Sequence, residues 1–480
     1  MDPSFLPAWR LAELTRSGAI GCSELVQHFI ARTERLNPRL NAVVARDFER
    51  ARERARRLDH QARDAAGPLF GVPMTVKESF DVAGLPSTWG YGNRAEHRAE
   101  ADALAVQRLE AAGAVVFGKT NVPVGLADWQ SYNPVYGTTS NPWHAGHTPG
   151  GSSGGGAAAL AAGLSALELG SDIGGSIRVP AHYCGLFGHK PSWGLCSPRG
   201  QSMVNAAAMT DIAVIGPMAR SARDLELALQ AVLGPDPAAA VLTYRLPPPR
   251  MERISELHVA VWLEEPGYAT DAETVALIDE LARYLEGEGA EVSRTARPEF
   301  DVHEAFRLYV TLLDAALSAR TTEAELARRR AEKQVLRPDD FATDSLFIRA
   351  VDLGHREWLG LNERRHQILR LWGTFFKRWD VLLCPVIATP ALPNMQEGET
   401  WQRSLSVDGR RIAYNDMLFW PGLTCAAHLP ASVAPIGLAG SGLPIGVQIA
   451  GPFGGDRTTI QVAAMLESSW RSFVPPPGWE

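Results

Sequence analysis

Short apolar runs with the pattern of buried strands alternate with helical patterns along most of this chain, and that alternation constrains its fold more than any other feature. The strand-like runs occupy residues 69–80, 113–120, 164–170, 257–263 and 379–386. The clearest helical patterns occupy residues 102–112, 221–233 and 271–286. Chains of this kind bury their strands in a sheet and pack the apolar stripes of their helices against it. The sequence therefore predicts an α/β layered fold.

Several further elements are expected outside this alternation. They are a helix over 25–36 capped by Ser23, an Arg- and Glu-rich helix over 43–64, a long loop over 127–152, a helix from Gly154, a mostly helical region over 302–379 and a hairpin within 431–451. Ser221 and Asp224 have the spacing of a capping box for the helix that follows them. Neither a Pro/Ser-rich linker nor an internal repeat divides the chain, so we expect one domain over residues 1–480.

Composition excludes several classes of protein. The 480 residues are 45% apolar and 21% charged, which is ordinary globular composition. The formal charge is 47 − 54 = −7, which disfavours a general nucleic-acid binder and a polybasic membrane anchor. Five widely spaced cysteines without a CxxC pair argue against a disulfide framework or a zinc ribbon. No signal-peptide pattern and no membrane span are visible, so we expect a cytoplasmic protein.

One motif suggests nucleotide binding and is better explained otherwise. Residues Gly113–Thr120 read GAVVFGKT, which fits the P-loop pattern GxxxxGK[ST]. The four middle residues are Ala, Val, Val and Phe, which favour an extended buried strand over a loop that wraps phosphates. Pro123 also interrupts the helix that a P-loop requires. We therefore expect a strand here, and no nucleotide cofactor.

The segment that indicates chemistry begins in a run without charged residues, from Trp129 to Leu167. Beyond Gly150 the chain carries two serines flanked by glycine, Ser152 and Ser176. Glycines beside a serine allow tight turns and close approach of a substrate. The backbone N–H groups of residues 173–176, which are Ile173, Gly174, Gly175 and Ser176, are expected to converge on one point. An acyl-transfer enzyme needs such donors for the oxyanion of its intermediate.

A nucleophilic serine also needs a base, and the residues alone leave two solutions open. The common GxSxG motif is absent, because Arg178 stands where the second glycine would be required. One solution is a histidine, and candidates stand at positions 144, 147, 182 and 189. The other is Lys77, which follows apolar residues, because burial disfavours the charged form of an amine. The pair His144 and His147 also suggests a metal ligand set, but it has no partner cluster, so no metal is expected.

Several segments together resemble the amidase signature family, the serine amidohydrolases that use a Ser–cis-Ser–Lys triad. They are GVPMTVKESF, GKTNVP, SNPWHAGHTPGGSSGG, GSDIGGSIRVPAHYCGLFGHKPS, GPMARSARDL and LPIGVQIAGPFGGD. The resemblance covers most of residues 10–235 and 375–470. It implies a single large layered domain with a mixed, mostly parallel twisted sheet covered by helices on both faces. It also implies a catalytic core over 70–235, a variable pocket region over 240–375 and a C-terminal part over 376–480 that completes the sheet.

Residue by residue, the resemblance assigns roles around the two serines. Ser176 matches the nucleophile, Ser152 the serine preceded by a cis peptide bond, and Lys77 the base, so the choice between histidine and lysine falls on lysine. The N–H groups of residues 173–176 match the oxyanion hole. The residues expected to support the site by hydrogen bonds are Ser153, Asp172 and Arg178. The resemblance implies an amidohydrolase acting on C–N bonds other than peptide bonds, with esters and carbamates as further substrates.

The substrate is open at this stage. Aromatic residues in loop 127–147 and in the middle region favour an apolar acyl or aryl group, and the candidates for the pocket are Trp129, Tyr132, Trp143, Phe306 and Tyr309. The expected partners are a small amide and water, without nucleic acid, membrane span, metal or cofactor. The oligomeric state is open, with a homodimer as the default expectation.

Two other functions compete with a stand-alone amidohydrolase. The first is the amidase subunit of a tRNA-dependent amidotransferase complex, which often carries Thr where this chain has Ile173. The second is a non-hydrolytic protein that keeps the fold as a binding scaffold. The presence of Lys77, Ser152 and Ser176 together argues against the scaffold.

Overall fold

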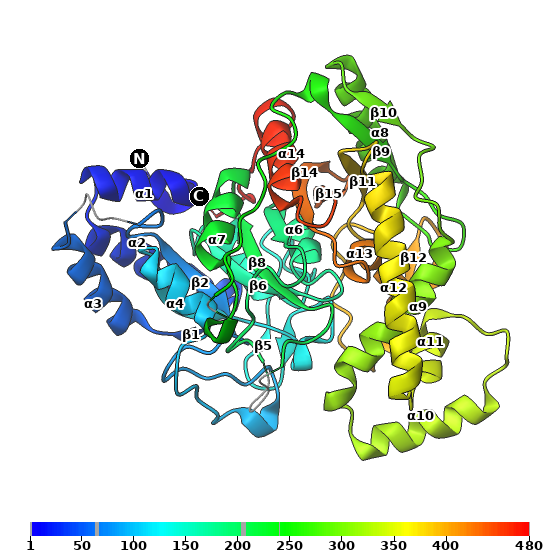
Figure 1. Ribbon diagram of the computed structural model, residues 1–480. Helices are drawn as coiled ribbons and strands as arrows, with labels where there is room; N and C mark the ends of the chain where they lie inside the picture. Colours follow the sequence, from blue (N-terminus) through cyan, green and yellow to red (C-terminus); the bar gives the residue numbers. More distant parts are fainter. Residues whose placement is uncertain (1, 63–66, 203–207, 240, 480) are drawn as a thin grey trace.

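An eleven-stranded sheet runs through the protein in the computed structural model, which describes residues 2–62, 67–202, 208–239 and 241–479 (Figure 1). In their order across the sheet the strands are β1 (Val43–Arg46), β3 (Val115–Thr120), β2 (Pro73–Lys77), β6 (Glu168–Asp172), β8 (Val214–Ala219), β7 (Phe187–Lys190), β14 (Ala431–Leu438), β15 (Pro444–Ala450), β11 (Val381–Pro385), β9 (His258–Val261) and β10 (Glu291–Ser293). Strands from both ends of the chain share this one sheet, as the predicted single domain requires.

The sheet is mixed, as predicted, and its parallel pairings lie in two groups toward its ends. These pairings are β2 with β3 and β6, and β9 with β10 and β11. Between the two groups, from β6 to β11, all described pairings are antiparallel, and β1 also pairs antiparallel with β3. Parallel pairing is thus the smaller part of the sheet, where the larger part was expected. Alternation of strands and helices does not fix strand direction, and a short connection such as the one from β14 to β15 favours an antiparallel pair.

Fourteen α-helices of the described chain cover the sheet or extend from it (Figure 1). They are α1 (Ala8–Ser17), α2 (Cys22–Leu36), α3 (Phe48–Asp59), α4 (Leu104–Ala111), α5 (Gly154–Ala161), α6 (Arg178–Cys184), α7 (Ala222–Val232), α8 (Ala272–Gly287), α9 (Val302–Leu317), α10 (Glu323–Val335), α11 (Thr343–Ala350), α12 (His355–Phe375), α13 (Phe419–Cys425) and α14 (Asp456–Ser469). Two small sheets complete the fold, β4 (Tyr132–Asn133) with β5 (Gly137–Thr138), and β12 (Ser404–Val407) with β13 (Arg410–Ala413). None of the helices in the described ranges is long and apolar enough to cross a lipid bilayer.

Two large hydrophobic clusters lie on opposite faces of the sheet, which confirms the layered fold. Successive side chains of a strand point to opposite faces. In β11, Val381 and Leu383 belong to one cluster, whereas Leu382 and Cys384 belong to the other. The first cluster packs against α1–α4, α7, α8 and α14, and the second against α5, α6, α9, α12 and α13. The site described below lies on the second face.

Most predicted elements are present, with corrections in the N-terminal part. Residues 43–46 were expected to begin a helix but form β1 beside β3, because the valines at this point pack at the edge of the sheet. The helix α3 begins only at Phe48. Residues 63–64 of the predicted helix lie outside the described part of the chain. The helix expected to be capped by Ser23 begins at Cys22, with Gly21 as its N-cap.

The predicted capping box is only half formed. Ser221 accepts a hydrogen bond from the Asp224 backbone N–H, as expected. The carboxylate of Asp224 instead accepts from the backbone N–H groups of Ala8 and Trp9 at the start of α1. Asp224 therefore holds the N-terminal helix against α7. The mostly helical region 302–379 and the hairpin within 431–451 are confirmed.

Candidate active site

Lys77 stands at the carboxyl end of β2, where the strand alternation turns its side chain away from the first hydrophobic cluster. Met74 and Val76 of the same strand belong to that cluster, so Lys77 lies on the opposite face. The side chain is fully buried. Its Nζ donates to Ser152 Oγ at 2.7 Å and to Ser171 Oγ at 3.0 Å. Two of the three residues that the sequence analysis selected, Lys77 and Ser152, are therefore in direct contact.

Burial shifts the protonation equilibrium of this amine. It lowers the pKa of Lys77 from 10.5 to about 7, although the charges of Asp172 and Glu168 oppose the shift and Arg320 adds to it. Desolvation disfavours the ammonium form. Near neutral pH a large fraction of Lys77 is therefore uncharged, which is the form that accepts a proton.

Ser152 lies in the turn that precedes α5, and the Gly151–Ser152 peptide bond is cis, as the resemblance implied. The N-cap of α5 is the next residue, Ser153, so Ser152 does not serve as the helix cap. Ser153 donates its backbone N–H to the Ser176 carbonyl at 3.2 Å, and its hydroxyl donates to the Ser171 carbonyl at 3.4 Å. Ser153 thus ties the turn of Ser152 to the segment that carries Ser176.

The segment after β6 is organised by a buried ion pair between Asp172 and Arg178. The guanidinium donates to both carboxylate oxygens, with Nη2 to Oδ1 at 2.9 Å and Nε to Oδ2 at 3.1 Å. Neither side chain is exposed. The carboxylate also accepts from the backbone N–H groups of Gly175 at 2.8 Å and Ile177 at 3.0 Å. Burial alone would raise the pKa of Asp172, but Arg178 and these hydrogen bonds hold it well below its usual range.

Two aromatic side chains orient the peptide groups between Asp172 and Ser176. Tyr309 donates its hydroxyl to the Ile173 carbonyl at 3.0 Å. Trp129 donates its indole N–H to the Gly174 carbonyl at 3.0 Å. Because the C=O and N–H of a trans peptide point in opposite directions, the contact with Tyr309 turns the N–H of Gly174 away from that ring.

Not all four N–H groups predicted for the oxyanion hole are available. The N–H of Gly175 already donates to Asp172, so the structure removes it from that set. Gly175 instead provides the turn, because its φ of +102° suits glycine. Within the described residues, the N–H groups of Ile173, Gly174 and Ser176 have no protein acceptor. These three donors remain for an anionic oxygen beside Ser176.

Ser152 and Ser176 line one large cavity of about 600 Å³. Ser176 is 7% exposed, which leaves its hydroxyl within reach of the cavity. The apolar and aromatic part of the lining includes Trp89, Trp129, Leu313, Leu317, Phe347 and Leu418. A volume in this range suits a small organic molecule.

The predicted pocket residues divide between this cavity and the core. Trp129 lines the cavity, as expected, but Tyr132 and Trp143 do not. Tyr132 donates to Asp128 and accepts from Arg403, and the indole of Trp143 donates to the Cys184 carbonyl. Both side chains form hydrogen bonds that hold loops against the rest of the fold. The sequence pattern does not distinguish an aromatic residue in this structural role from one that lines a pocket.

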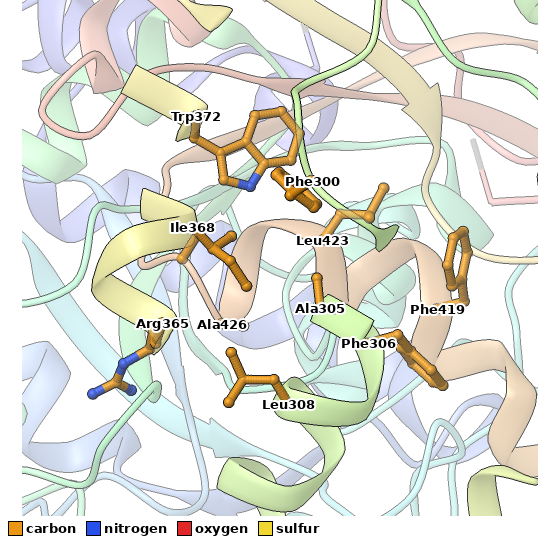
Figure 2. A pocket seen from close by; sticks show the side chains of 12 residues that line it. Phe300, Ala305, Phe306, Leu308, Arg365, Ile368, Trp372, Phe419, Leu423 and Ala426 are labelled. Carbon is orange, nitrogen blue, oxygen red and sulfur yellow. The ribbon is translucent and has the colours of Figure 1, made fainter. Parts of the chain in front are cut away.

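Tyr309 and Phe306 also lie outside the cavity lining. Tyr309 is buried behind the turn that its hydroxyl holds. Phe306 extends from α9 beside Phe419 into a second, small pocket of about 20 Å³, which Figure 2 shows among apolar side chains such as Leu308 and Ile368. That volume is close to the space of a single water molecule, so the second pocket is a packing gap in the core.

Two residues of the site were missed by the sequence analysis. Ser171 accepts from Lys77 at 3.0 Å, and Gln201 donates to Ser171 Oγ at 3.2 Å and to Ser79 Oγ at 3.2 Å. Strands β2 and β6 are parallel neighbours, so their carboxyl ends bring Lys77 and Ser171 together. A prediction that these two strands are paired would have identified Ser171 as a neighbour of Lys77. No comparable signal points to Gln201, which reaches the site from a loop.

The histidines left open by the sequence are engaged elsewhere, and none lines the cavity in the described chain. His182 contacts the backbone of Thr389 and Gly446, and burial lowers its pKa to about 4. His189 contacts Ser432 and Asp456. His144 and His147 touch each other in an exposed loop. Across the described residues, no group of three or more His, Cys, Asp or Glu side chains could hold a metal ion.

The P-loop-like segment is a buried strand, as predicted. Residues Val115–Thr120 form β3 within the sheet. Lys119 is buried and donates to the hydroxyl of Ser87 at 2.9 Å and to the carbonyl of Pro86. The segment therefore offers no loop of free N–H groups for phosphate.

Comparison with known proteins agrees with this geometry. The family model described as Amidase matches residues 24–460. A protein of Synechococcus sp. (strain CC9605) that is named as a subunit of glutamyl-tRNA(Gln) amidotransferase is 32% identical, with 98% of this chain and 97% of that protein covered. The 6-aminohexanoate-cyclic-dimer hydrolase of Paenarthrobacter ureafaciens is 33% identical, with 95% and 93% covered. A solved structure of a 6-aminohexanoate cyclic dimer hydrolase superimposes with a TM-score of 0.80 at 30% identity, covering 99% of both chains.

Proposed function

This chain belongs to the amidase family of enzymes that hydrolyse amide C–N bonds, and from that premise we propose that it is a serine amidohydrolase. It cleaves carboxylic amides through an acyl-enzyme on Ser176, with Ser152 as relay and neutral Lys77 as base. Esters and carbamates, which present the same carbonyl carbon to the nucleophile, fall within the proposed substrate range. The reaction needs water and no cofactor.

The observation that carries this proposal is the buried amine of Lys77, 2.7 Å from the Ser152 hydroxyl in the wall of the cavity that Ser176 also lines. A lysine is a base only when it is neutral, and burial lowers the pKa of Lys77 to about 7. Its described hydrogen bonds go to Ser152 and Ser171, and none goes to a carboxylate that would keep it charged.

The mechanism moves one proton forward and back. Lys77 accepts the proton of Ser152, Ser152 accepts that of Ser176, and the Ser176 oxygen attacks the carbonyl carbon of the substrate. The negative charge that develops on the carbonyl oxygen is stabilised by the free N–H groups of Ile173, Gly174 and Ser176. The proton then passes through the relay to the leaving amine as the C–N bond breaks. Water, deprotonated by the same relay, attacks the acyl-enzyme. The bond between the acyl carbon and the Ser176 oxygen breaks, the relay returns the proton to that oxygen, and the carboxylic acid is released.

A second candidate is the amidase subunit of a tRNA-dependent amidotransferase complex. It is favoured by the similarity, over nearly the full length, to a protein named as such a subunit. The same acyl-enzyme chemistry would serve both functions, but the subunit would need partner chains. Activity of the isolated protein therefore distinguishes them.

The test is turnover of the purified chain, without partners, on a panel of anilides, alkyl amides, esters and carbamates. We expect hydrolysis of at least one amide, and loss of about 10³-fold or more in Ser176→Ala, because the covalent step is removed. Substantial turnover in Ser176→Ala would contradict the assignment of the nucleophile. Absence of turnover across the panel would contradict self-sufficient hydrolysis and favour the amidotransferase subunit, for which co-purification of partner chains is the next measurement.

A further inference from the structure

Arg320 brings an uncompensated positive charge to the wall of the catalytic cavity. It ends the 3-10 turn Ser318–Arg320 that follows α9, and it lines the same cavity as Ser152 and Ser176. Its Nη1 donates to the Gly125 carbonyl at 2.6 Å, and its guanidinium lies 5.5 Å from the centroid of the Trp89 ring. These two contacts fix the side chain at the cavity without neutralising it.

Every other charged side chain of the described lining has a hydrogen-bonding partner, and every other cation among them has a carboxylate partner. Each has an oppositely charged or amide partner within hydrogen-bond distance: Asp128 with Arg403, Asp172 with Arg178, Asp314 with Arg329, Arg328 with Glu325 and Glu332, and Asp344 with Asn415. Arg320 has no carboxylate partner in the part of the chain that the structure describes. Arg320 is therefore the described cation of the lining that lacks a carboxylate partner. The lining as a whole is not positive, because Asp344 has only an amide partner and Arg328 is shared by two carboxylates.

A guanidinium has five N–H donors, and the Gly125 carbonyl is the only described acceptor of Arg320. Partial burial of such a group without an anion is unfavourable, and burial lowers the pKa of Arg320 accordingly. A carboxylate is the matching ligand, because its two oxygens accept parallel hydrogen bonds from the planar guanidinium. Arg320 lines the same cavity as Ser152 and Ser176, and its charge also lowers the pKa of Lys77.

We propose that Arg320 binds a carboxylate carried by the substrate, so that the preferred substrates are amides with an acidic group in the acyl or the amine part. The inference rests on the proposed amidohydrolase function and adds the substrate class to it. The aromatic and apolar lining then holds the part of the substrate between its carboxylate and its scissile amide.

Three amides of similar shape test the proposal: one is neutral, one carries a carboxylate in the acyl part, and one carries a carboxylate in the amine part. They are butyranilide, N-phenylsuccinamic acid with the carboxylate in the acyl part, and 4-butyramidobenzoic acid with the carboxylate in the amine part. In Arg320→Gln we expect kcat/KM of at least one acid relative to butyranilide to fall about 10- to 100-fold, the size expected for a charged hydrogen bond. The ratio of kcat/KM for an acid to kcat/KM for butyranilide reports on recognition of the carboxylate alone. Removing Arg320 also raises the pKa of Lys77, but this slows every substrate equally and cancels in the ratio.

Arg330→Gln is the matched control. Arg330 lies on α10, pairs with Asp352 and is exposed outside the cavity, so this variant removes the same charge without touching the lining. In Arg330→Gln, kcat/KM of each acid relative to butyranilide should equal the value for the unchanged protein. Arg320→Lys should restore part of the ratio, because an ammonium keeps the charge without the bidentate geometry. An equal ratio in Arg320→Gln and Arg330→Gln for both acids would overturn the proposal.

A binding measurement keeps this test independent of turnover. Calorimetric titration of Ser176→Ala with each of the two acids should give a Kd that weakens about tenfold or more in Ser176→Ala/Arg320→Gln for at least one of them. A Kd unchanged by Arg320→Gln for both acids would overturn carboxylate recognition even if the enzyme hydrolyses amides. Tight, Arg320-dependent binding without hydrolysis by the unchanged protein would instead support the inference and contradict the proposed function.

Discussion

The two sides of the cavity that Ser152 and Ser176 line are built differently. The sheet side, formed by Ser152, Ser176 and residues 171–174, consists almost entirely of buried groups. The helix side, formed by lining residues between Leu313 and Ile348 in α9, α10 and α11, includes partly exposed charged side chains such as Glu325 and Arg328. Figure 1 shows these helices at the opposite end of the molecule from α1–α3. We interpret the sheet side as the part that performs chemistry and the helix side as the part that selects the substrate.

One buried ion pair on each side of the cavity illustrates how the two sides differ. Asp172 pairs with Arg178 and also accepts backbone N–H groups, so its pKa lies well below the usual range in spite of its burial. Asp314 pairs with Arg329 at 2.8 Å, but burial outweighs the partner and raises its pKa. An ion pair inside a protein is thus strongly stabilised where the backbone also donates to it. The sheet side has this support, and the helix side does not.

The largest effect on activity is expected from Lys77→Ala on the sheet side. Removing the proposed base should lower kcat about 10²- to 10⁴-fold, the usual contribution of general acid–base catalysis. The measurement is kcat for an anilide at pH 8, normalised to the folded fraction.

Lys119→Met is the matched control for that variant. Lys119 is also a buried lysine, on the neighbouring strand β3, and it donates to Ser87 and Pro86 away from the two serines. Its variant should lose stability while kcat of the folded fraction stays within a few-fold. An equal loss of kcat in the two variants would mean that any buried lysine of the sheet matters equally, and the role of Lys77 as base would be wrong.

The sheet side was largely predictable from the sequence, because its residues stand in short local motifs. Lys77, Ser152, Asp172 and Arg178 lie together as the resemblance implied. Ser171 was missed although it is next to Asp172, because its contact with Lys77 depends on the pairing of two strands. Likewise, donation from Gly175 to Asp172 is a property of the folded turn, which no spacing rule reveals.

The helix side was not predictable, for a different physical reason. Its charged residues have the pattern of an ordinary solvated helix face, so nothing singles out Arg320 before the fold places it at the cavity. Aromatic residues are equally misleading, because Trp143 and Phe306 gain as much from packing in the core as from lining a pocket. Pocket walls assembled from distant segments therefore need the structure.

The next largest effect is a difference in stability between the two aspartates. Asp172→Asn leaves Arg178 buried without its counter-charge and should lower the free energy of unfolding by about 3–5 kcal/mol. Asp314→Asn removes a carboxylate whose ionised form is already disfavoured, and should cost about 1–3 kcal/mol, the range for one lost hydrogen bond. Denaturant midpoints at constant m-value measure both.

Asp172→Asn combined with Arg178→Met is the control for this comparison. The double variant removes both charges and should recover part of the loss, because no buried charge remains unpaired. It also keeps the comparison testable if Asp172→Asn alone does not fold. Equal costs at Asp172 and Asp314 would remove the distinction between the two sides.

The pH dependence of activity tests the sheet side more finely. Only neutral Lys77 accepts a proton, so kcat/KM should rise about tenfold per pH unit below about 7 and level off above it. Glu168 is buried beside it, with its own pKa raised to about 8, and its negative charge favours the charged amine. Below pH 7, however, Glu168 is mostly protonated and carries little of that charge, so in Glu168→Gln the acid limb of the profile should stay close to its place, and any shift should be toward lower pH. A flat profile from pH 5 to 9, or a limb that moves to higher pH, would contradict the assignment.

The smallest effect is expected for Arg328 and Glu325 on the helix side. Their side chains are 38% and 32% exposed and 2.6 Å apart, three residues apart on α10. Water and salt screen such a pair, and two long side chains lose rotamer freedom in holding it, so a double-mutant cycle with Arg328→Gln and Glu325→Gln should give about 0.2–1 kcal/mol. At 1 M salt this coupling should vanish, since the screening length falls to about 3 Å, whereas the buried pair of Asp172 and Arg178 should keep its coupling. A coupling above about 2 kcal/mol in the exposed pair that persists at high salt would contradict this expectation. The helix side would then be held as firmly as the sheet side, and the distinction between the two sides would be wrong.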